Sequence, residues 1–394
     1  MLRAGIRRKS TGDIPHSLKV PKTVFILPLP KRAGVIGRIL ICGQGDKGRF
    51  EWKHPTLVSS ARALNVVDIA AGGIRNLLLT LEGEVYSFGL DDLKLVPRRI
   101  NLPNKVLKIS AGNMHAACLL EDGRVLAWGS FHISGSNMNL NLKENAFDAV
   151  DVLPGIVVCD IASGKDHLIL LSCDGKIYTI GCGEQGQLGR AFLRSVLKRG
   201  YNQTDLLKPD QVQIRHHEHI EAIWATSYCT FVKESVSGKI FGFGLNDYKQ
   251  LGCHTNMSPI CIPISVNMDN ILQIAGGQHH TMSLKDDDAV MITGRLEPIK
   301  EKSITLRPVS DLKRKRIINI FCGEAQSFAL TSNGEVYAWG VSSSYQLGLG
   351  TNNDVLKPTL IKSLHTDGNR VIKVSSSGQH TIFLVEDEIQ FADT

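Results

Sequence analysis

Short apolar strands alternate with glycine-containing turns along most of the chain, and one such unit recurs seven times. Each copy ends in an apolar, aromatic-rich strand that closes on glycine: ILICG at 39–43, VYSFG at 85–89, VLAWG at 125–129, IYTIG at 177–181, IFGFG at 240–244, VMITG at 290–294 and VYAWG at 336–340. The closing glycines are 46, 40, 52, 63, 50 and 46 residues apart, a period typical of β-propeller blades. Six of the strands follow a turn and a second apolar strand, as in HLILLSCDG at 167–175, so the unit is predicted to contain a hairpin.

A third element precedes the hairpin and consists of small residues followed by Gly-x-x-His or a related sequence. The copies read AAGGIRN at 70–76, SAGNMHA at 110–116, ASGKDHL at 162–168, AGGQHHT at 275–281, FCGEAQS at 321–327 and SSGQHT at 376–381, while WATSYCTF at 224–231 takes the same place without glycine or histidine. Glycine allows backbones to approach closely where blades converge. The histidine can bridge neighbouring backbone groups, so its predicted role is structural.

The two ends of the repeat array complete one another. The first copy, Ile39 to Gly43, has the closing strand without a Gly-x-x-His element before it, whereas Val371 to Asp387 has that element and one strand with nothing after them. A ring whose final blade uses both ends leaves no open strand edge. The sequence therefore predicts an all-β protein, a seven-bladed β-propeller over residues 38–390 whose closing blade is built from both chain ends. Helical repeats are disfavoured because strand-type alternation recurs and long 3.6-residue periodicity does not.

The positive charge of the chain is concentrated at its N-terminus. Residues 1–36 carry eight Lys or Arg and one acid, Asp13, which leaves 37 basic and 37 acidic residues in the rest of a chain with a formal net charge of +7. We expect residues 1–37 to form a basic, disordered arm suited to nuclear import or to phosphate contact, with Arg7, Arg8 and Lys9 as its densest basic run. The alternative is a solubilising tail without a partner.

Several classes of protein are disfavoured by what the sequence lacks. There is no run of 18 or more apolar residues, so no membrane partner is expected. The nine cysteines include no C-x-x-C pair, which suggests neither a zinc site nor a disulfide framework and favours a reducing compartment. No G-x-x-x-x-G-K-[ST] loop and no clustered metal ligands or paired catalytic carboxylates recur. We therefore expect no cofactor, and a propeller lyase or hydrolase is a weak alternative.

Three longer motifs make the family recognisable: GCGEQGQLGR at 181–190, FGFGLNDYKQLG at 241–252 and AWGVSSSYQLGLG at 338–350. Together with ASGKDHL and AGGQHHT they resemble the family of the regulator of chromosome condensation, and the resemblance covers residues 38–387. It implies a nuclear, chromatin-bound guanine nucleotide exchange factor for the small GTPase Ran, with roles in nucleocytoplasmic transport and mitosis. Such a factor stabilises the nucleotide-free GTPase and performs no bond-making chemistry.

The resemblance implies three GTPase contacts by motif. Asp166 in ASGKDHL matches an acidic contact, although a capping role within the repeat is an open alternative. His279, the first histidine of GGQHH, matches a functional histidine, while His280 fills the repeat's structural position. Arg190, which closes GQGQLGR, matches a further contact on the same side.

Other positions depart from the family pattern. Asn113 stands where the family has an aspartate, and Arg75 stands where a repeat normally has histidine. The family's projecting wedge corresponds to HISGSNMNLNL at 132–142, where Ser134, Gly135 and Ser136 can form a hairpin tip. Losing one charged contact costs about 2–5 kcal/mol of binding. The competing hypothesis is therefore a propeller scaffold that binds nucleosomes or other proteins and has lost exchange activity.

The resemblance also implies contacts with chromatin. A long insertion, AFLRSVLKRGYNQTDLLKP at 191–209, lies where the family sends an arginine into the acidic patch of the histone dimer, which makes Arg194, Lys198 and Arg199 the candidates here. The basic arm, with Arg7, Arg8 and Lys9, would contact DNA phosphates. A solvated loop without a partner is the alternative for the insertion.

Overall fold

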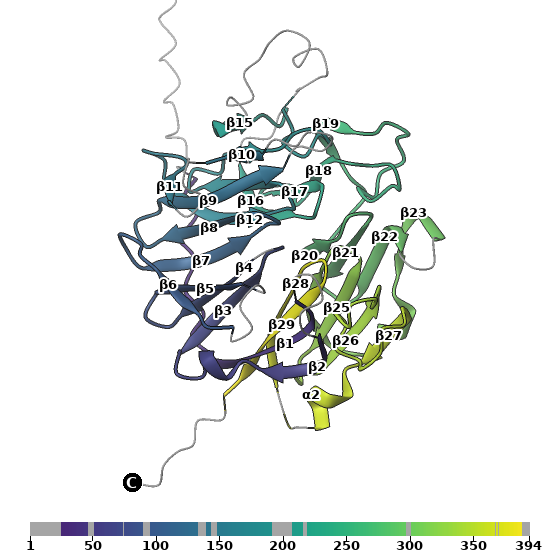
Figure 1. Cartoon of the computed structure of the whole chain (residues 1–394). Coiled ribbons are helices and arrows are strands. Elements are labelled where there is room, and N and C mark those ends of the chain that lie inside the picture. Colours follow the sequence, from purple (N-terminus) through teal and green to yellow (C-terminus); the bar gives the residue numbers. More distant parts are fainter. Residues whose placement is uncertain are drawn as a thin grey trace, which may run out of the picture.

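The chain folds into a ring of small antiparallel sheets (Figure 1). The computed structural model describes residues 25–45, 51–73, 75–89, 95–132, 139–142, 148–190, 207–215, 219–296, 301–366, 368 and 370–387. Among these residues, the helical elements are the short α2 (Lys362–Thr366) and the 3-10 turns η2 (Ser59–Ala61) and η4 (Ser310–Leu312), and Leu207 is also in a 3-10 conformation. No helix in the described part of the chain is long and apolar enough to cross a bilayer.

Five of the six sheets that the described residues form are one blade each, and the eight-stranded sheet contains two blades. We number the blades in the order of their innermost strands. Blade 1 consists of β3 (Val66–Ala71), β4 (Arg75–Thr80), β5 (Val85–Gly89) and β6 (Arg98–Ile100). Blade 2 consists of β7 (Val106–Ala111), β8 (His115–Leu120) and β9 (Val125–His132), with β10 (Asn139–Asn141) and β11 (Val150–Asp151) both paired to β9. Blade 3 consists of β12 (Val158–Ser163), β13 (His167–Ser172), β14 (Ile177–Gly181) and β15 (Asp210–Val212).

The remaining blades follow the same order. Blade 4 consists of β16 (Ile220–Ala225), β17 (Cys229–Glu234), β18 (Ile240–Gly244) and β19 (Ile260–Ser265). Blade 5 consists of β20 (Ile271–Gly276), β21 (His280–Lys285), β22 (Val290–Leu296) and β23 (Glu301–Pro308). Blade 6 consists of β24 (Ile317–Cys322), β25 (Gln326–Thr331), β26 (Val336–Gly340) and β27 (Val355–Leu360). Blade 7 consists of β28 (Val371–Ser376), β29 (His380–Glu386), β1 (Gly37–Gln44) and β2 (Glu51–Leu57).

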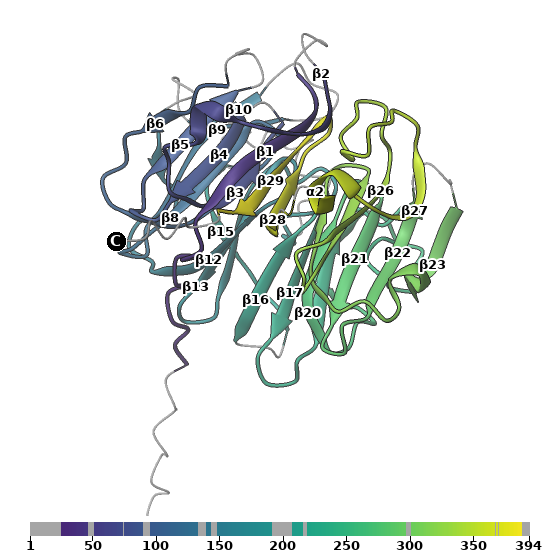
Figure 2. The same ribbon diagram turned by 90° about the horizontal axis from the view of Figure 1, so that it is seen from below.

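Blade 7 closes the ring with strands from both ends of the chain. β1 pairs antiparallel with β29 in continuous register from Gly37–Glu386 to Gly43–His380, and both Figure 1 and Figure 2 show the purple β1 beside the yellow β29. A single pair, Gly37–Val66, joins this blade to blade 1. The innermost strands contact one another in the cyclic order β3, β7, β12, β16, β20, β24 and β28, and β28 returns to β3. The predicted seven-bladed propeller and its closure are confirmed.

Glycine and histidine of the Gly-x-x-His loops join neighbouring blades. A Cβ on Gly164 would lie 2.1 Å from Cε1 of His167 and 2.4 Å from the carbonyl oxygen of Thr226 in blade 4, so only glycine fits. The Nε2 atom of His167 lies 2.9 Å from Oγ1 of Thr230, and that of His280 lies 2.9 Å from Oγ of Ser327. His167 and His280 therefore bridge blades as expected, although their partners are side chains of the next blade, whereas backbone partners were predicted.

The propeller has two different ends, which we name after their loops. The loop face carries the Gly-x-x-His loops and the loops that follow the closing glycines, and the turn face carries the hairpin turns. The turn glycines adopt positive φ, for example 81° at Gly123 and 79° at Gly175, which is a backbone conformation that glycine adopts without strain. Apolar side chains fill the spaces between blades, and phenylalanines such as Phe131 and Phe243 are fully buried there.

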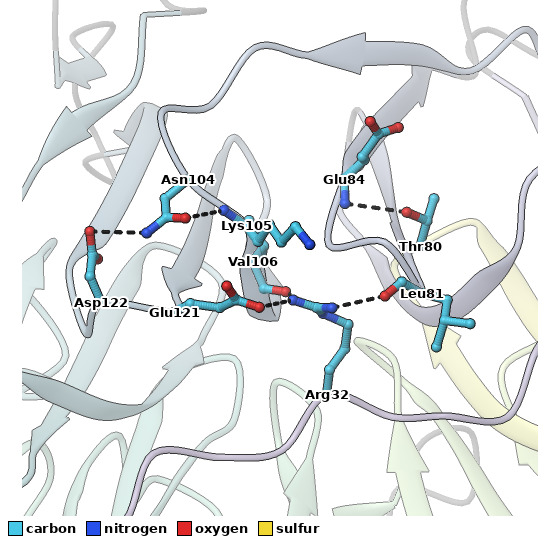
Figure 3. A network of polar contacts seen from close by, with 9 residues as sticks. All are labelled: Arg32, Thr80, Leu81, Glu84, Asn104, Lys105, Val106, Glu121 and Asp122. Carbon is cyan, nitrogen blue, oxygen red and sulfur yellow. Dashed lines mark hydrogen bonds and ion pairs between the residues drawn. The ribbon is translucent and has the colours of Figure 1, made fainter.

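Residues 25–36 lie against the turn face, which differs from the disordered arm expected over residues 1–37. The Arg32 guanidinium donates to the carbonyl oxygens of Val106 and Leu81 at 2.7 and 2.8 Å and pairs with Glu121 at 2.6 Å (Figure 3). The Phe25 ring stacks on that of His219 at 4.3 Å. These contacts pair the Arg32 guanidinium and partly bury the Phe25 ring, which explains why residues 25–36 are held against the propeller. Arg7, Arg8 and Lys9 lie outside the described residues.

Candidate partner-binding face

The loops of all seven blades meet around the channel on the loop face. The channel mouth is a cavity of about 220 Å³. Every blade contributes to its lining, with Gly73, Asn113, Lys165, Ser227, Gly276, Glu324 and Ser377 among the lining residues. Backbone hydrogen bonds link the loops to one another. The backbone N–H of Asn113 donates to the carbonyl oxygen of Lys165 at 2.8 Å, and the backbone N–H of Lys165 donates to the carbonyl oxygen of Ser227 at 3.0 Å. The side chains at this mouth are therefore held on a rigid frame.

An ion pair spans the channel mouth. Lys165 of blade 3 and Glu324 of blade 6 lie 2.8 Å apart, and the Gln278 amide donates to Glu324 at 2.5 Å. Burial acts to lower the pKa of Lys165, but the hydrogen bond and charge of Glu324 outweigh it and raise that pKa. Sequence reasoning did not find these residues. The available signal was that both charges directly follow the loop glycine, in repeats three blades apart.

Asp166 is buried beside that ion pair. Its side chain is only 5% exposed, and Oδ1 accepts a hydrogen bond of 3.0 Å from the backbone N–H of His132 at the end of β9. Burial raises the pKa of this carboxyl, although the bond from His132 opposes the shift. The geometry favours the capping role of Asp166 over direct contact, because the carboxylate fixes the strand that leads into the predicted wedge. Ser134, Gly135 and Ser136 of that wedge lie outside the described residues.

Asn113 and His279 line different parts of the loop face. Asn113 borders the channel mouth, and its Oδ1 packs so closely on Gly73 that a Cβ there would lie 2.0 Å away. The His279 ring meets Tyr248 edge-on at 4.8 Å, and Arg295 lies over the same Tyr248 ring at 5.1 Å while donating to its hydroxyl at 3.1 Å. His279 thus belongs to an aromatic and cationic cluster between blades 4 and 5, whose Tyr248 and Arg295 sequence reasoning missed. His280 is buried in its bridging role.

Arg190 is directed into its own blade. Its side chain is 11% exposed, Nη2 donates to the Thr179 carbonyl at 2.9 Å, and Nη1 lies 3.7 Å from Asp210. Burial lowers its pKa, and Asp210 partly opposes this. The guanidinium therefore ties β14 to β15, and it is not displayed with Asn113 and His279 as the motif implied. Arg194, Lys198 and Arg199 lie outside the described residues.

The described residues offer no site for a metal ion. No group of three or more His, Cys, Asp or Glu side chains among them is arranged to hold one. The loop face instead presents polar side chains around the channel mouth.

Comparison with known proteins identifies the family. Residues 38–383 match the RCC1-like domain. This chain belongs to the RCC1-like domain family. It is 41% identical over 405 residues to the regulator of chromosome condensation of Drosophila melanogaster, covering 95% of this chain and 73% of the relative. The Homo sapiens regulator of chromosome condensation is 34% identical over 394 residues, covering 90% of this chain and 92% of the relative.

A solved structure of the RCC1-like type shows the same fold. The Prp20p structure from Saccharomyces cerevisiae superposes with a TM-score of 0.80 at 21% sequence identity, covering 93% of this chain and 97% of Prp20p. That structure is described together with the binding properties of Prp20p to Gsp1p and histones. The family resemblance predicted from the motifs is confirmed.

Proposed function

We propose that this RCC1-like chain is a chromatin-associated guanine nucleotide exchange factor for the small GTPase Ran. The observation that carries the proposal is the loop face, where Asn113 and the Lys165–Glu324 ion pair line the channel mouth and the His279 cluster lies between blades 4 and 5. Two findings support the choice of partners. Relatives of the chain are named regulators of chromosome condensation, and the Prp20p structure is described with binding to Gsp1p and histones. We place the protein in the nucleus on the same grounds.

Exchange on this surface requires no bond to be made or broken. A face that binds the nucleotide-free GTPase more tightly than the nucleotide-bound form lowers the affinity for nucleotide by the same factor, because the two binding equilibria are linked. The frame of backbone hydrogen bonds around the channel mouth presents these side chains without an ordering cost at the moment of binding. The wedge would act next to them, since Asp166 anchors the end of β9 at His132.

Chromatin contact is assigned to other parts of the molecule. Residues 25–36 run along the turn face, which is opposite the loop face proposed to bind the GTPase. Arg7, Arg8 and Lys9 are proposed to contact DNA phosphates. Arg194, Lys198 and Arg199 are proposed to contact the acidic patch of the histone dimer.

Release of labelled GDP from purified Ran tests the exchange activity directly. The chain should accelerate release, and excess free nucleotide should dissociate its complex with Ran by linkage. The proposal is wrong if the chain neither accelerates release nor binds nucleotide-free Ran.

A second function is favoured by Asn113, whose amide lacks the carboxylate of the family pattern. The chain would then be a propeller scaffold that binds nucleosomes without exchange. Nucleosome binding combined with no acceleration of GDP release would support this function. Arg194→Ala and Arg199→Glu should weaken nucleosome binding and leave free-DNA binding nearly intact, because their proposed partner is a carboxylate cluster.

A further inference from the structure

A cavity between blades 1 and 2 marks the place where one bridging histidine is missing. In blades 2 and 3 a Cβ on Gly112 or Gly164 would meet Cε1 of the histidine ring at 2.1 Å. In blade 1 the corresponding Gly72 has Ala111 Cβ, at 3.5 Å, as its nearest side-chain neighbour. Arg75 stands at the histidine position, so no ring occupies this space.

The resulting cavity is apolar and opens on the loop face. It has a volume of about 230 Å³, and Leu77, Met114, Ala116 and Trp128 form much of its wall, with Arg75 and Asn113 also lining it. It adjoins the end of β9 that leads into the wedge region. The cavity therefore lies beside two features of the proposed GTPase-binding surface, Asn113 and the wedge.

The chemistry of the wall indicates the class of group that fits. Where the bridge exists, the next blade supplies a polar acceptor such as Thr230, Ser327 or Asn76. At this position blade 2 supplies Ala116, which cannot hydrogen-bond to an imidazole. A hydrocarbon ring would fill the space without leaving a buried polar atom unpaired, and it would pack on the Trp128 indole.

We propose that this cavity, which we call the blade 1–2 socket, receives one aromatic side chain of the GTPase that docks on the loop face. The inference rests on the proposed function. A single ring inserted into a preformed apolar pocket with a polar surround is the usual form of an interface hot spot. Such an anchor would place the GTPase against Asn113 and the wedge in one orientation.

Rebuilding the missing bridge closes the socket. The double variant Arg75→His/Ala116→Thr reproduces the His167–Thr230 pair of blades 3 and 4, and Ala116→Leu fills the socket from its other wall. Thr230→Ser makes a conservative change at the intact bridge between blades 3 and 4 and leaves the socket open, so it is the control. Thermal unfolding identifies which variants retain the native fold.

Two measurements separate the socket from the exchange activity. Titration with benzyl alcohol, followed by tryptophan emission, should saturate in the wild type and in Thr230→Ser and should be lost in both closed variants; Trp128→Phe locates the signal. Affinity for nucleotide-free Ran should fall by about tenfold or more in the folded closed variants and change less than about twofold in Thr230→Ser.

The two measurements fail in different ways. An unsaturable benzyl alcohol response in the wild type, or wild-type Ran affinity in a folded closed variant, overturns the socket. Absence of any Ran binding by the wild type, with a saturable benzyl alcohol response that closure removes, overturns the proposed function and with it the assignment of the socket's occupant.

Discussion

The Nε2 atom of His167 lies 2.9 Å from the Oγ1 atom of Thr230, and this contact joins blade 3 to blade 4. The Thr230 hydroxyl also donates to the Gln187 carbonyl at 2.8 Å. Because that donation uses the hydroxyl proton, Nε2 of His167 is the donor to Oγ1, and the ring is held as one neutral tautomer.

Removal of the Thr230 hydroxyl should destabilise the propeller. Thr230→Val keeps the shape of the side chain but leaves His167 without its partner at a fully buried position, which should lower the free energy of unfolding by about 1–3 kcal/mol. Thr230→Ser retains the hydroxyl and should lose less. Urea denaturation measures both. Equal stability of Thr230→Val and the wild type would refute a stabilising role for the bridge.

Acid should destabilise the propeller through its buried histidines. Burial lowers the pKa of His115 and His167 from 6.5 to about 3, and that of His280 and His380 to about 4. Below pH 6.5 the unfolded chain takes up protons that the native chain does not. The free energy of unfolding therefore has its full value, as far as these histidines are concerned, above about pH 6.5. As the pH falls toward 4, each histidine lowers the free energy of unfolding by about 1.4 kcal/mol per pH unit.

Unfolding titrations at several pH values in that window measure this slope. His167→Gln is the control, because Gln326 occupies the corresponding place in blade 6 and its Nε2 donates to Gly378 at 3.3 Å. In the variant one proton fewer should be taken up on unfolding, so the slope of the free energy of unfolding against pH should fall by about 1.4 kcal/mol per pH unit. An unchanged slope would show that His167 is not one of the titrating groups.

Asp166 can be tested for positioning against direct contact. Asp166→Asn keeps an oxygen that accepts the N–H of His132, whereas Asp166→Ala removes it. If the carboxylate positions β9, the Ala variant should slow stimulated GDP release by about tenfold through kcat, and the Asn variant should stay near the wild type. Equal losses in both variants, seen in KM, would instead indicate a charged contact with Ran.

Asn113→Asp restores the charge of the family pattern at the channel mouth. The side chains are nearly isosteric, so the change adds a negative charge with little alteration of packing. We expect faster stimulated GDP release and a steeper dependence of that rate on ionic strength. Asn113→Ala is the control for the amide itself. A rate that Asn113→Asp does not change would place the limiting step at the wedge.

Stepwise truncation should separate the arm from the fold. Removal of residues 1–24 should leave stability unchanged and flatten the salt dependence of DNA binding. Removal of residues 1–34 also deletes Phe25 and Arg32, whose contacts lie on the turn face, and should lower stability by about 1.5–3 kcal/mol. Removal of residues 1–43 deletes most of β1 and should prevent folding. A folded monomer without β1 would contradict closure of blade 7 by both chain ends.

The amino-acid sequence by itself determined the architecture. The strand pattern, the turn glycines and the glycine of ASGKDHL are local requirements, because alternation and positive φ are set by each residue and its neighbours. Closure of the ring also follows from the sequence. Ile39 to Gly43 is a closing strand without a Gly-x-x-His element before it, and the segment after Val371 has that element but no closing strand. The motifs GCGEQGQLGR and AWGVSSSYQLGLG indicate the family by themselves.

The positions of the charged side chains were decided only by the tertiary structure. Lys165 and Glu324 are far apart in the sequence and meet because the ring places blades 3 and 6 across the channel. Arg190 turns inward because the Thr179 carbonyl and Asp210 lie within its reach. Asp166 is buried because β9 of the neighbouring blade offers it an N–H. Each outcome depends on distances between blades, and these distances exist only after the ring has closed.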